Sequence, residues 1–160
     1  LAWSRGLGDV YKRQDSNSII NTAISYNVSA MELRQRKKTL SLLASFTALE
    51  TMVNYEYKDF KPEACSECGQ KQFKVAKKIR EYLLKYIGDS PSNKKKFNQY
   101  YSLRSKIVHT GQQLKTEQLF SDTTKDERDT EFITTLEILQ LGTLSICNWL
   151  LTKLHEEQST

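Results

Sequence analysis

The stretch YYSLRSKIVHTG at residues 100–111 decides the predicted fold and holds the strongest candidate for a functional site. Aromatic and aliphatic residues recur in it at the spacing of one helix face, and Gly111 is placed to end the helix in the left-handed conformation. The stretch also contains Arg104 and His109, and the chain has only one other histidine. We therefore predict a helix from about Asn93 to His109 that carries both side chains near its end.

Three more helices are predicted before and after this one. They span about residues 32–55, 70–87 and 127–155. Each has apolar residues at helical spacing, and Pro62 breaks the pattern after the first of them. Ser90 or Ser92 is placed to cap the helix that follows. Proline and glycine are scarce, at two and six residues, which favours helices over strands. We predict an all-α bundle of four to five helices.

The N-terminal residues are expected to lie outside this bundle. Residues 1–14, LAWSRGLGDVYKRQ, resemble a translated sequencing-adapter scar, and we exclude them from the fold prediction. Residues 15–30 are rich in Ser and Asn and have weak periodicity, so we expect a loop, an extended lead-in or a linker from preceding sequence. The domain itself is then 31–160, a usual size for one domain, at the end of a longer protein.

Basic and acidic residues are unevenly distributed along the chain. From Asp15 to Lys115 there are 18 basic and 9 acidic residues, whereas Thr116 to Thr160 contains 3 basic and 9 acidic residues. A basic body with an acidic tail is compatible with a polyanionic partner. Charge alone favours the simpler interpretation, a set of solvated helix faces.

The cysteines and the longest apolar run indicate the cellular compartment and bear on whether the chain binds a metal or spans a membrane. Three cysteines without a signal-peptide pattern indicate a reducing compartment, and we expect a cytoplasmic protein. Cys65 and Cys68 form half of a zinc site, but Cys147 is expected to be buried and no second pair exists. We therefore expect no metal and no cofactor. The apolar run at 138–151 is shorter than the about 20 residues that span a bilayer, so we expect no membrane segment.

The last predicted helix is apolar on more than one face. Ile133, Leu141, Leu144 and Leu151 lie on other sides than its main stripe. A helix of this kind has to be covered on several faces, and a four-helix bundle covers only some of them. We expect a second copy of the chain to cover the rest.

Arg104 and His109 are five positions apart, which does not place one above the other. Five residues turn a helix by about 140° and advance it by about 7.5 Å. Arginine is long enough to bend back, so both side chains can reach one phosphate if the helix end faces a cleft. The alternative is a surface arginine and a histidine that interacts with the free carbonyls of the helix end.

The stretch at 100–111 resembles the signature of the HEPN superfamily, specifically its Apea-like branch. In that signature a Tyr, an Arg-Ser pair, two aliphatic residues, a His and a Gly occur in this order, and the resemblance covers about Thr39 to Leu154. It implies a helical bundle that dimerises through the signature and C-terminal helices, so that two signature helices form one composite cleft. Many such domains are metal-independent endoribonucleases, and the resemblance suggests a toxin or an antiviral effector.

The resemblance assigns catalytic roles to Arg104, Ser105 and His109. RNA carries its own nucleophile, the 2′-OH; histidine can move a proton near pH 7 and arginine can stabilise charge on phosphorus. The expected products are a 2′,3′-cyclic phosphate and a 5′-hydroxyl. Ser105 stands where some active families have Asn, Asp or His, and this departure puts catalysis in doubt. The alternative is a catalytically inactive HEPN module for dimerisation or nucleic-acid sensing, with an N-terminal domain or an antitoxin as partner.

Further candidates for RNA binding are Lys94, Lys95, Lys96, Lys106 and Arg80. The run of three lysines lies about 20 Å from His109 along the helix, so a solubilising role is as plausible as a role in following the RNA backbone. Tyr100 and Tyr101 can stack on bases, although core packing is the simpler interpretation. His155 is expected to lie at a solvated helix end.

Overall fold

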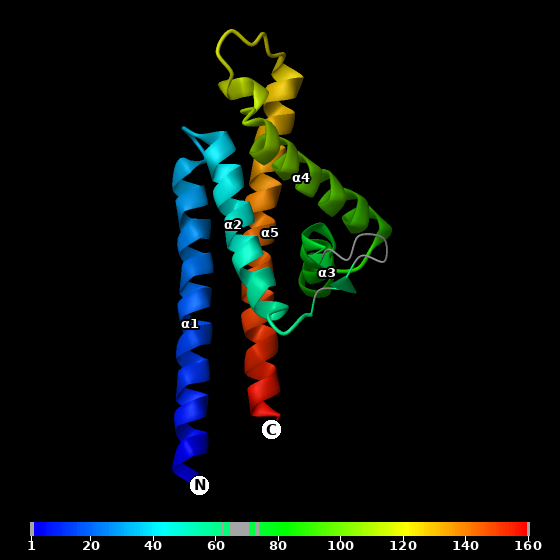
Figure 1. Ribbon diagram of the computed structural model, residues 1–160. Helices are drawn as coiled ribbons and strands as arrows, with labels where there is room; N and C mark the ends of the chain where they lie inside the picture. The colour runs from blue at the N-terminus through cyan, green and yellow to red at the C-terminus, as the bar shows by residue number, and fades with distance from the viewer. Residues whose placement is uncertain (1, 62, 65–70, 73, 160) are drawn as a thin grey trace.

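The computed structural model describes residues 2–61, 63–64, 71–72 and 74–159, with side chains for 17–61 and 74–159. Its elements are α1 (Ala2–Leu33), α2 (Lys38–Glu56), β1 (Glu63–Ala64), β2 (Lys71–Gln72), α3 (Val75–Ile87), α4 (Pro91–Thr110), the 3₁₀ helix η1 (Lys115–Glu117) and α5 (Lys125–Gln158). Figure 1 shows α1, α2 and α5 as three long helices side by side, with α3 and α4 on one side of them. The prediction of an all-α helical bundle is confirmed, and one antiparallel pair of two-residue strands accompanies it.

The core lies where α2 and α5 pack together and are covered by the other helices. The largest fully buried side chains come from α2, α3 and α5 and include Leu42, Leu49, Met52, Ile79, Tyr82 and Ile138. α4 adds Phe97 and Ile107, both buried. Full burial of one such aliphatic side chain stabilises the folded state by about 1.5–3 kcal/mol. Since α4 contributes to this core, its position relative to α2 is fixed by packing.

The expectation of a loop or an extended lead-in at residues 15–30 is wrong, because these residues are helical and belong to α1. The side of α1 that packs inward uses mostly small or polar residues, Ala23, Asn27 and Ala30, and therefore lacks a stripe of large apolar residues. Asn27 donates a hydrogen bond to Thr143 of α5 (2.8 Å). A Cβ at Gly142 would lie 2.8 Å from the Asn27 side chain, so this close approach needs glycine. The nature of residues 1–14 stays a prediction, and their side chains lie outside the described part.

The predicted capping residues of the signature helix are confirmed, although the helix begins at Pro91, two residues before the predicted Asn93. Ser90 accepts a hydrogen bond from the backbone N–H of Asn93, and Pro91 occupies the first turn, where its missing N–H has no helical partner to lose. At the other end Gly111 has φ 66° and donates its N–H to the carbonyl of Ile107. The helix runs one residue past His109, to Thr110, so the histidine sits in the last full turn.

The connection after α4 is tied back to α2 by a carboxylate. Glu117 accepts hydrogen bonds from the backbone N–H groups of Lys38 (2.6 Å) and Thr39 (2.8 Å), the first residues of α2. Lys37 at the cap position of α2 makes no side-chain cap of its own. Glu117 therefore satisfies free N–H groups that the local sequence leaves open.

On α5 the exposed side carries more apolar residues than a single bundle can cover. Leu144 and Leu151 remain exposed, as expected for the faces that a second copy was predicted to cover. Cys147 is also exposed, so the expectation that it is buried is wrong; its position on the helix groups it with Leu144 and Leu151. Cys65 and Cys68 lie outside the described residues. None of the helices in the described part has an apolar stretch long enough to cross a membrane.

Candidate functional site

Arg104 is anchored at the contact between α4 and α2. Its Nη2 lies 2.8 Å from Oε1 and 3.0 Å from Oε2 of Glu50, and the two side chains are 22% and 23% exposed. Arg104 also lies next to the ring of Tyr101, at 5.9 Å from the ring centre. The guanidinium is therefore fixed in place and still borders solvent.

Only one corner of the guanidinium is used by this ion pair. An arginine has five N–H donors on three nitrogens, and Glu50 contacts Nη2. Within the described part of the chain, Nε and Nη1 of Arg104 make no hydrogen bond. Their N–H bonds point to different sides of the guanidinium, because both bidentate edges of an arginine include Nη2, so each of the two nitrogens can donate a separate hydrogen bond to an anion. Arg104 can thus keep its contact with Glu50 and bind an anion at the same time.

His109 projects from the last turn of α4 into solvent. It is exposed, and within the described residues it has no hydrogen bond and no ion pair. Ser105, one residue after Arg104, is partly exposed. Arg104 and His109 are separated by about 7.5 Å along the helix and about 140° around it. The structure brings the three predicted residues to one end of α4 without a direct contact between the arginine and the histidine.

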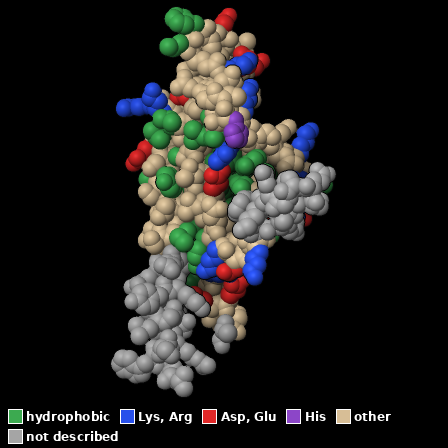
Figure 2. All heavy atoms as spheres, in the orientation of Figure 1, with side chains coloured by type: hydrophobic (Ala, Val, Ile, Leu, Met, Phe, Trp, Pro, Cys, Tyr) green, Lys and Arg blue, Asp and Glu red, His purple; other side chains and the backbone are tan. Residues whose placement is uncertain are grey.

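This end of α4 adjoins an apolar surface on α2. Figure 2 shows a histidine on the face toward the viewer, above a basic and an acidic side chain and beside hydrophobic side chains over the upper part of α2. Leu40 of α2 and Val108 of α4 are exposed, and Leu43 is partly exposed. We call Leu40, Leu43 and Val108, together with Glu50 and Arg104, the α2–α4 face. It combines exposed apolar residues with the candidate site.

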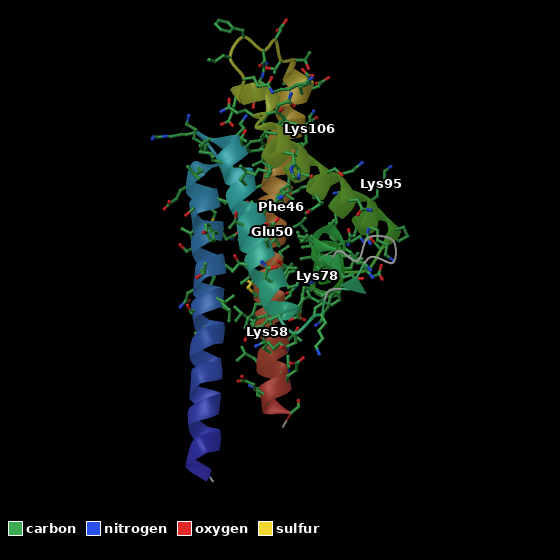
Figure 3. All side chains as sticks on the ribbon, in the orientation of Figure 1. Phe46, Glu50, Lys58, Lys78, Lys95 and Lys106 are labelled. Carbon is green, nitrogen blue, oxygen red and sulfur yellow. The ribbon has the colours of Figure 1, made fainter. Side chains whose placement is uncertain are left out.

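The five predicted cations divide into paired and unpaired residues. Lys94 contacts Asp89 (2.8 Å) and Lys96 contacts Glu137 (3.0 Å). Arg80 donates a hydrogen bond to Asn98 (3.1 Å), so it holds α3 to α4. Lys95 and Lys106 are exposed and have no ion pair with any described residue. Figure 3 shows Lys106 near the end of α4 that carries the candidate site and Lys95 toward the other end.

The two tyrosines of the signature differ in burial. Tyr100 is buried, and its hydroxyl donates a hydrogen bond to Glu137 of α5. Core packing with a satisfied hydroxyl is therefore the interpretation that applies to Tyr100. Tyr101 is partly exposed beside Arg104, and its ring is the one that can contact a bound base.

Sequence reasoning missed Glu50. It lies 54 residues before Arg104, and no local pattern connects the two. One feature could have indicated it: Glu50 is the only charged residue between Thr39 and Tyr55. A single carboxylate in such a segment is expected to have a cationic partner elsewhere in the fold.

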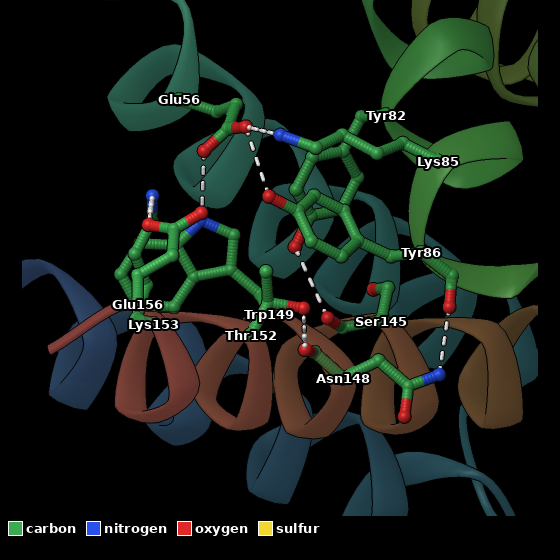
Figure 4. A network of polar contacts seen from close by, with 10 residues as sticks. All are labelled: Glu56, Tyr82, Lys85, Tyr86, Ser145, Asn148, Trp149, Thr152, Lys153 and Glu156. Atoms are coloured by element: carbon green, nitrogen blue, oxygen red, sulfur yellow. Dashed lines mark hydrogen bonds and ion pairs between the residues drawn. The ribbon is translucent and has the colours of Figure 1, made fainter. Parts of the chain in front are cut away.

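A second polar cluster, also not predicted, lies at the other end of α2. Glu56 accepts hydrogen bonds from Lys85, Tyr86 and Trp149, from α3 and α5 (Figure 4). Burial by itself would raise the pKa of Glu56, but the hydrogen bonds from Lys85, Trp149 and Tyr86 outweigh burial and lower it. Burial and the neighbouring carboxylate raise the pKa of Tyr86. Because these groups satisfy one another, the cluster joins three helices and offers no free group for catalysis.

Metal ligands do not gather anywhere in the described part of the chain: no group of three or more His, Cys, Asp or Glu side chains could hold an ion there. No protein-family model, no curated protein and no solved structure matches this chain. The resemblance to the HEPN signature therefore remains a prediction from residues 100–111 and the surrounding helices.

Proposed function

We propose that the chain is a metal-independent endoribonuclease that cleaves single-stranded RNA, with Arg104, Ser105 and His109 as catalytic residues. The proposal rests on how the guanidinium of Arg104 and the imidazole of His109 are held. Arg104 is fixed by Glu50 with two nitrogens unoccupied, and His109 is exposed on the same end of α4. A fixed cation and an accessible proton-transfer group are the two requirements of 2′-OH attack on phosphorus.

In this proposal each residue has a defined task. Nε or Nη1 of Arg104 donates a hydrogen bond to a non-bridging oxygen of the scissile phosphate and stabilises the charge that develops on it. His109 takes the proton from the 2′-OH or gives one to the leaving 5′-oxygen. Ser105 donates a hydrogen bond to a phosphate oxygen. Glu50 is a positioning residue, because it acts through Arg104.

The composite cleft requires a second copy, since Arg104 and His109 of one chain do not touch. We place this contact on the α2–α4 face, where Leu40 and Val108 are exposed beside the site. A two-fold axis near the end of α4 would bring the histidine of one copy toward the arginine of the other.

The alternative is a catalytically inactive module for dimerisation or nucleic-acid sensing. One observation favours it: Glu50 neutralises the charge of Arg104 in the absence of RNA. In that case the α2–α4 face would serve assembly and RNA binding only.

The experiment is cleavage of a labelled single-stranded RNA in EDTA. Wild-type protein should produce 2′,3′-cyclic phosphate and 5′-hydroxyl ends, and Arg104→Ala and His109→Ala should each abolish cleavage while keeping the helical circular dichroism spectrum. His155→Ala is the matched control, because that histidine is also exposed but lies near the end of α5. RNA binding without cleavage by the wild-type protein would establish the inactive module instead.

A further inference from the structure

A second exposed apolar surface lies on α1 and α5, away from the α2–α4 face. We call it the α1–α5 outer face; it consists of Ile24, Val28 and Met31 of α1 and Ile133, Leu144, Cys147, Leu151 and Leu154 of α5. The seven apolar residues other than Cys147 are each between 40% and 57% exposed. Monomeric proteins rarely leave so many large apolar side chains exposed on one surface.

The spacing on both helices is that of a helix-packing seam. On α5 the face follows positions 140, 144, 147, 151 and 154, with Ile133 two turns before them, and on α1 positions 17, 21, 24, 28 and 31. Steps of three and four residues keep one stripe on one side of a helix. The buried residues of α5, among them Gly142 and Trp149, lie about 200° around the helix from Leu144 and Leu151. The stripe of α5 therefore points away from α2.

Three contacts show that α1 and α5 are neighbours along the length of the two stripes. At one end Asn17 of α1 and Leu154 of α5 line the same pocket, which has a volume of about 540 Å³. In the middle Asn27 bonds to Thr143, and at the other end the guanidinium of Arg34 lies 5.2 Å from the ring centre of Phe132. α1 and α5 thus run antiparallel along this length, and the two stripes lie on neighbouring helices.

Apart from its ends at Ile133 and Leu154, this face is formed by segments that contain no charge. Residues 16–31 and 138–152 include no Asp, Glu, Lys or Arg, although charged residues make up 27% of the chain. RNA does not suit this face, because cations lie only at its ends and its middle gains nothing from phosphate neutralisation. A different protein would ordinarily be selected by charge complementarity, which this face does not provide. A two-fold contact between identical faces requires no charge complementarity.

We infer that the occupant of the α1–α5 outer face is a second copy of this chain, packed helix pair against helix pair as a four-helix bundle. Burial of one aliphatic side chain removes on the order of 100 Å² from water. Seven residues that are each about half exposed contribute on the order of 50–100 Å² each, and with the interleaved Asn21 and Gln140 they come to more than half of the roughly 800 Å² that each partner contributes to a standard interface. The polar Asn21 and Gln140 would fix the register of the helices.

This inference does not depend on the proposed nuclease activity. It adds a second interface, so that the assembly can contain more than two copies of the chain. The α2–α4 face and the α1–α5 outer face lie on different sides of the bundle, so one two-fold contact cannot use both. A chain that uses each for a separate two-fold contact forms a tetramer if the two axes close. The sequence predicted one dimer contact formed by both the signature and the C-terminal helices. In this arrangement each of the two helices belongs to a different interface.

The test is the molar mass of the purified full chain by light scattering over a range of concentrations. Leu144→Glu and Leu151→Glu each place a charge on the outer face, twice in a two-fold contact, and should raise its dissociation constant by at least roughly 100-fold. The mass should fall twofold. Both residues are more than half exposed in the single chain, so the substitutions should leave folding intact. Leu119→Glu is the control, because Leu119 is exposed in the loop before α5.

A second measurement is the reaction of Cys147 with a maleimide in a Cys65→Ser, Cys68→Ser background. Cys147 should react slowly in the assembly and at the rate of a free thiol in Leu151→Glu. Unchanged mass in both outer-face variants, with Cys147 reacting freely in the parent, overturns the inference.

Val108→Glu on the α2–α4 face separates the two proposals. Loss of cleavage and a twofold lower mass with Cys147 still protected support both interfaces. If only the outer-face variants become monomers, this inference stands and the composite cleft fails.

Discussion

Nη2 of Arg104 contacts both carboxylate oxygens of Glu50, at 2.8 and 3.0 Å, across the contact between α4 and α2. The pair is neither fully buried nor on the open surface. Its partners come from helices that the core already holds together, so little side-chain freedom remains to be lost when it forms. A pair of this kind is suited to orient a guanidinium rather than to stabilise the fold.

The first prediction concerns Glu50→Gln. The amide keeps one acceptor for Nη2 but removes a negative charge close to the proposed phosphate position. Two unit charges about 8 Å apart at an effective dielectric constant of about 20 interact by roughly 2 kcal/mol. We expect single-stranded RNA to bind up to about 30-fold more tightly at low salt, measured by fluorescence anisotropy.

The same variant should cleave more slowly, because a weaker hydrogen bond holds the guanidinium. Single-turnover cleavage with saturating RNA isolates this step from binding. Equal affinity and an equal rate in wild type and Glu50→Gln would show that Glu50 has no part in the site.

The second prediction concerns His109→Ala. Removal of a proton-transfer group typically lowers a rate by 10²–10⁴-fold, and we expect a loss of cleavage of about this size. RNA affinity and thermal stability should change little, since the side chain is exposed and makes no contact in the described part of the chain. A His109→Ala protein that cleaves at the wild-type rate would remove the histidine from the mechanism.

Local features of the sequence predicted local features of the fold. The ends of α4 follow from Ser90 and Gly111 because a cap depends on a few neighbouring residues. α1 could not be predicted in this way, since its inward side uses Ala23, Asn27 and Ala30 and depends on the close approach of Gly142. The signature predicted Arg104, Ser105 and His109, but the partner of Arg104 is set by how α2 packs on α4. Such a contact between distant segments leaves no periodic pattern.

The third prediction compares lysines on one helix. Lys95 and Lys106 have no ion pair within the described residues, whereas the charges of Lys94 and Lys96 are neutralised by Asp89 and Glu137. Each phosphate contact on single-stranded RNA contributes about −0.7 to the slope of log affinity against log salt. Lys106→Ala should reduce that slope by about 0.7, and Lys96→Ala should leave it nearly unchanged. Equal effects of the two variants would contradict a role for pairing.

The fourth prediction is the acid sensitivity that Glu56 gives to the fold. Its pKa is lowered from 4.5, because hydrogen bonds from Lys85, Trp149 and Tyr86 outweigh the effect of burial. A carboxylate with a lowered pKa stabilises the folded state above its ordinary pKa, and this contribution is lost as the pH falls through the lowered value. Glu56→Gln should therefore be less stable than wild type at pH 7, and the difference should shrink below about pH 4.5. Urea unfolding at several pH values measures the free energy of unfolding of both proteins. A difference between them that does not change with pH would contradict the prediction.

The last prediction tests how the segment after the signature helix is held. Glu117 supplies the N-terminal cap of α2 through hydrogen bonds of 2.6 and 2.8 Å to Lys38 and Thr39. Loss of a cap costs about 0.5–2 kcal/mol, and 1 kcal/mol shifts Tm by about 2–4 °C in a domain of this size. Glu117→Ala should lower Tm by several degrees in differential scanning calorimetry. Asp122→Ala is the matched control, because that carboxylate lies in the same connection, is exposed and makes no hydrogen bond to a described residue. Equal Tm values in the two variants would show that the helix start of α2 is satisfied by solvent, and that the connection does not depend on this contact.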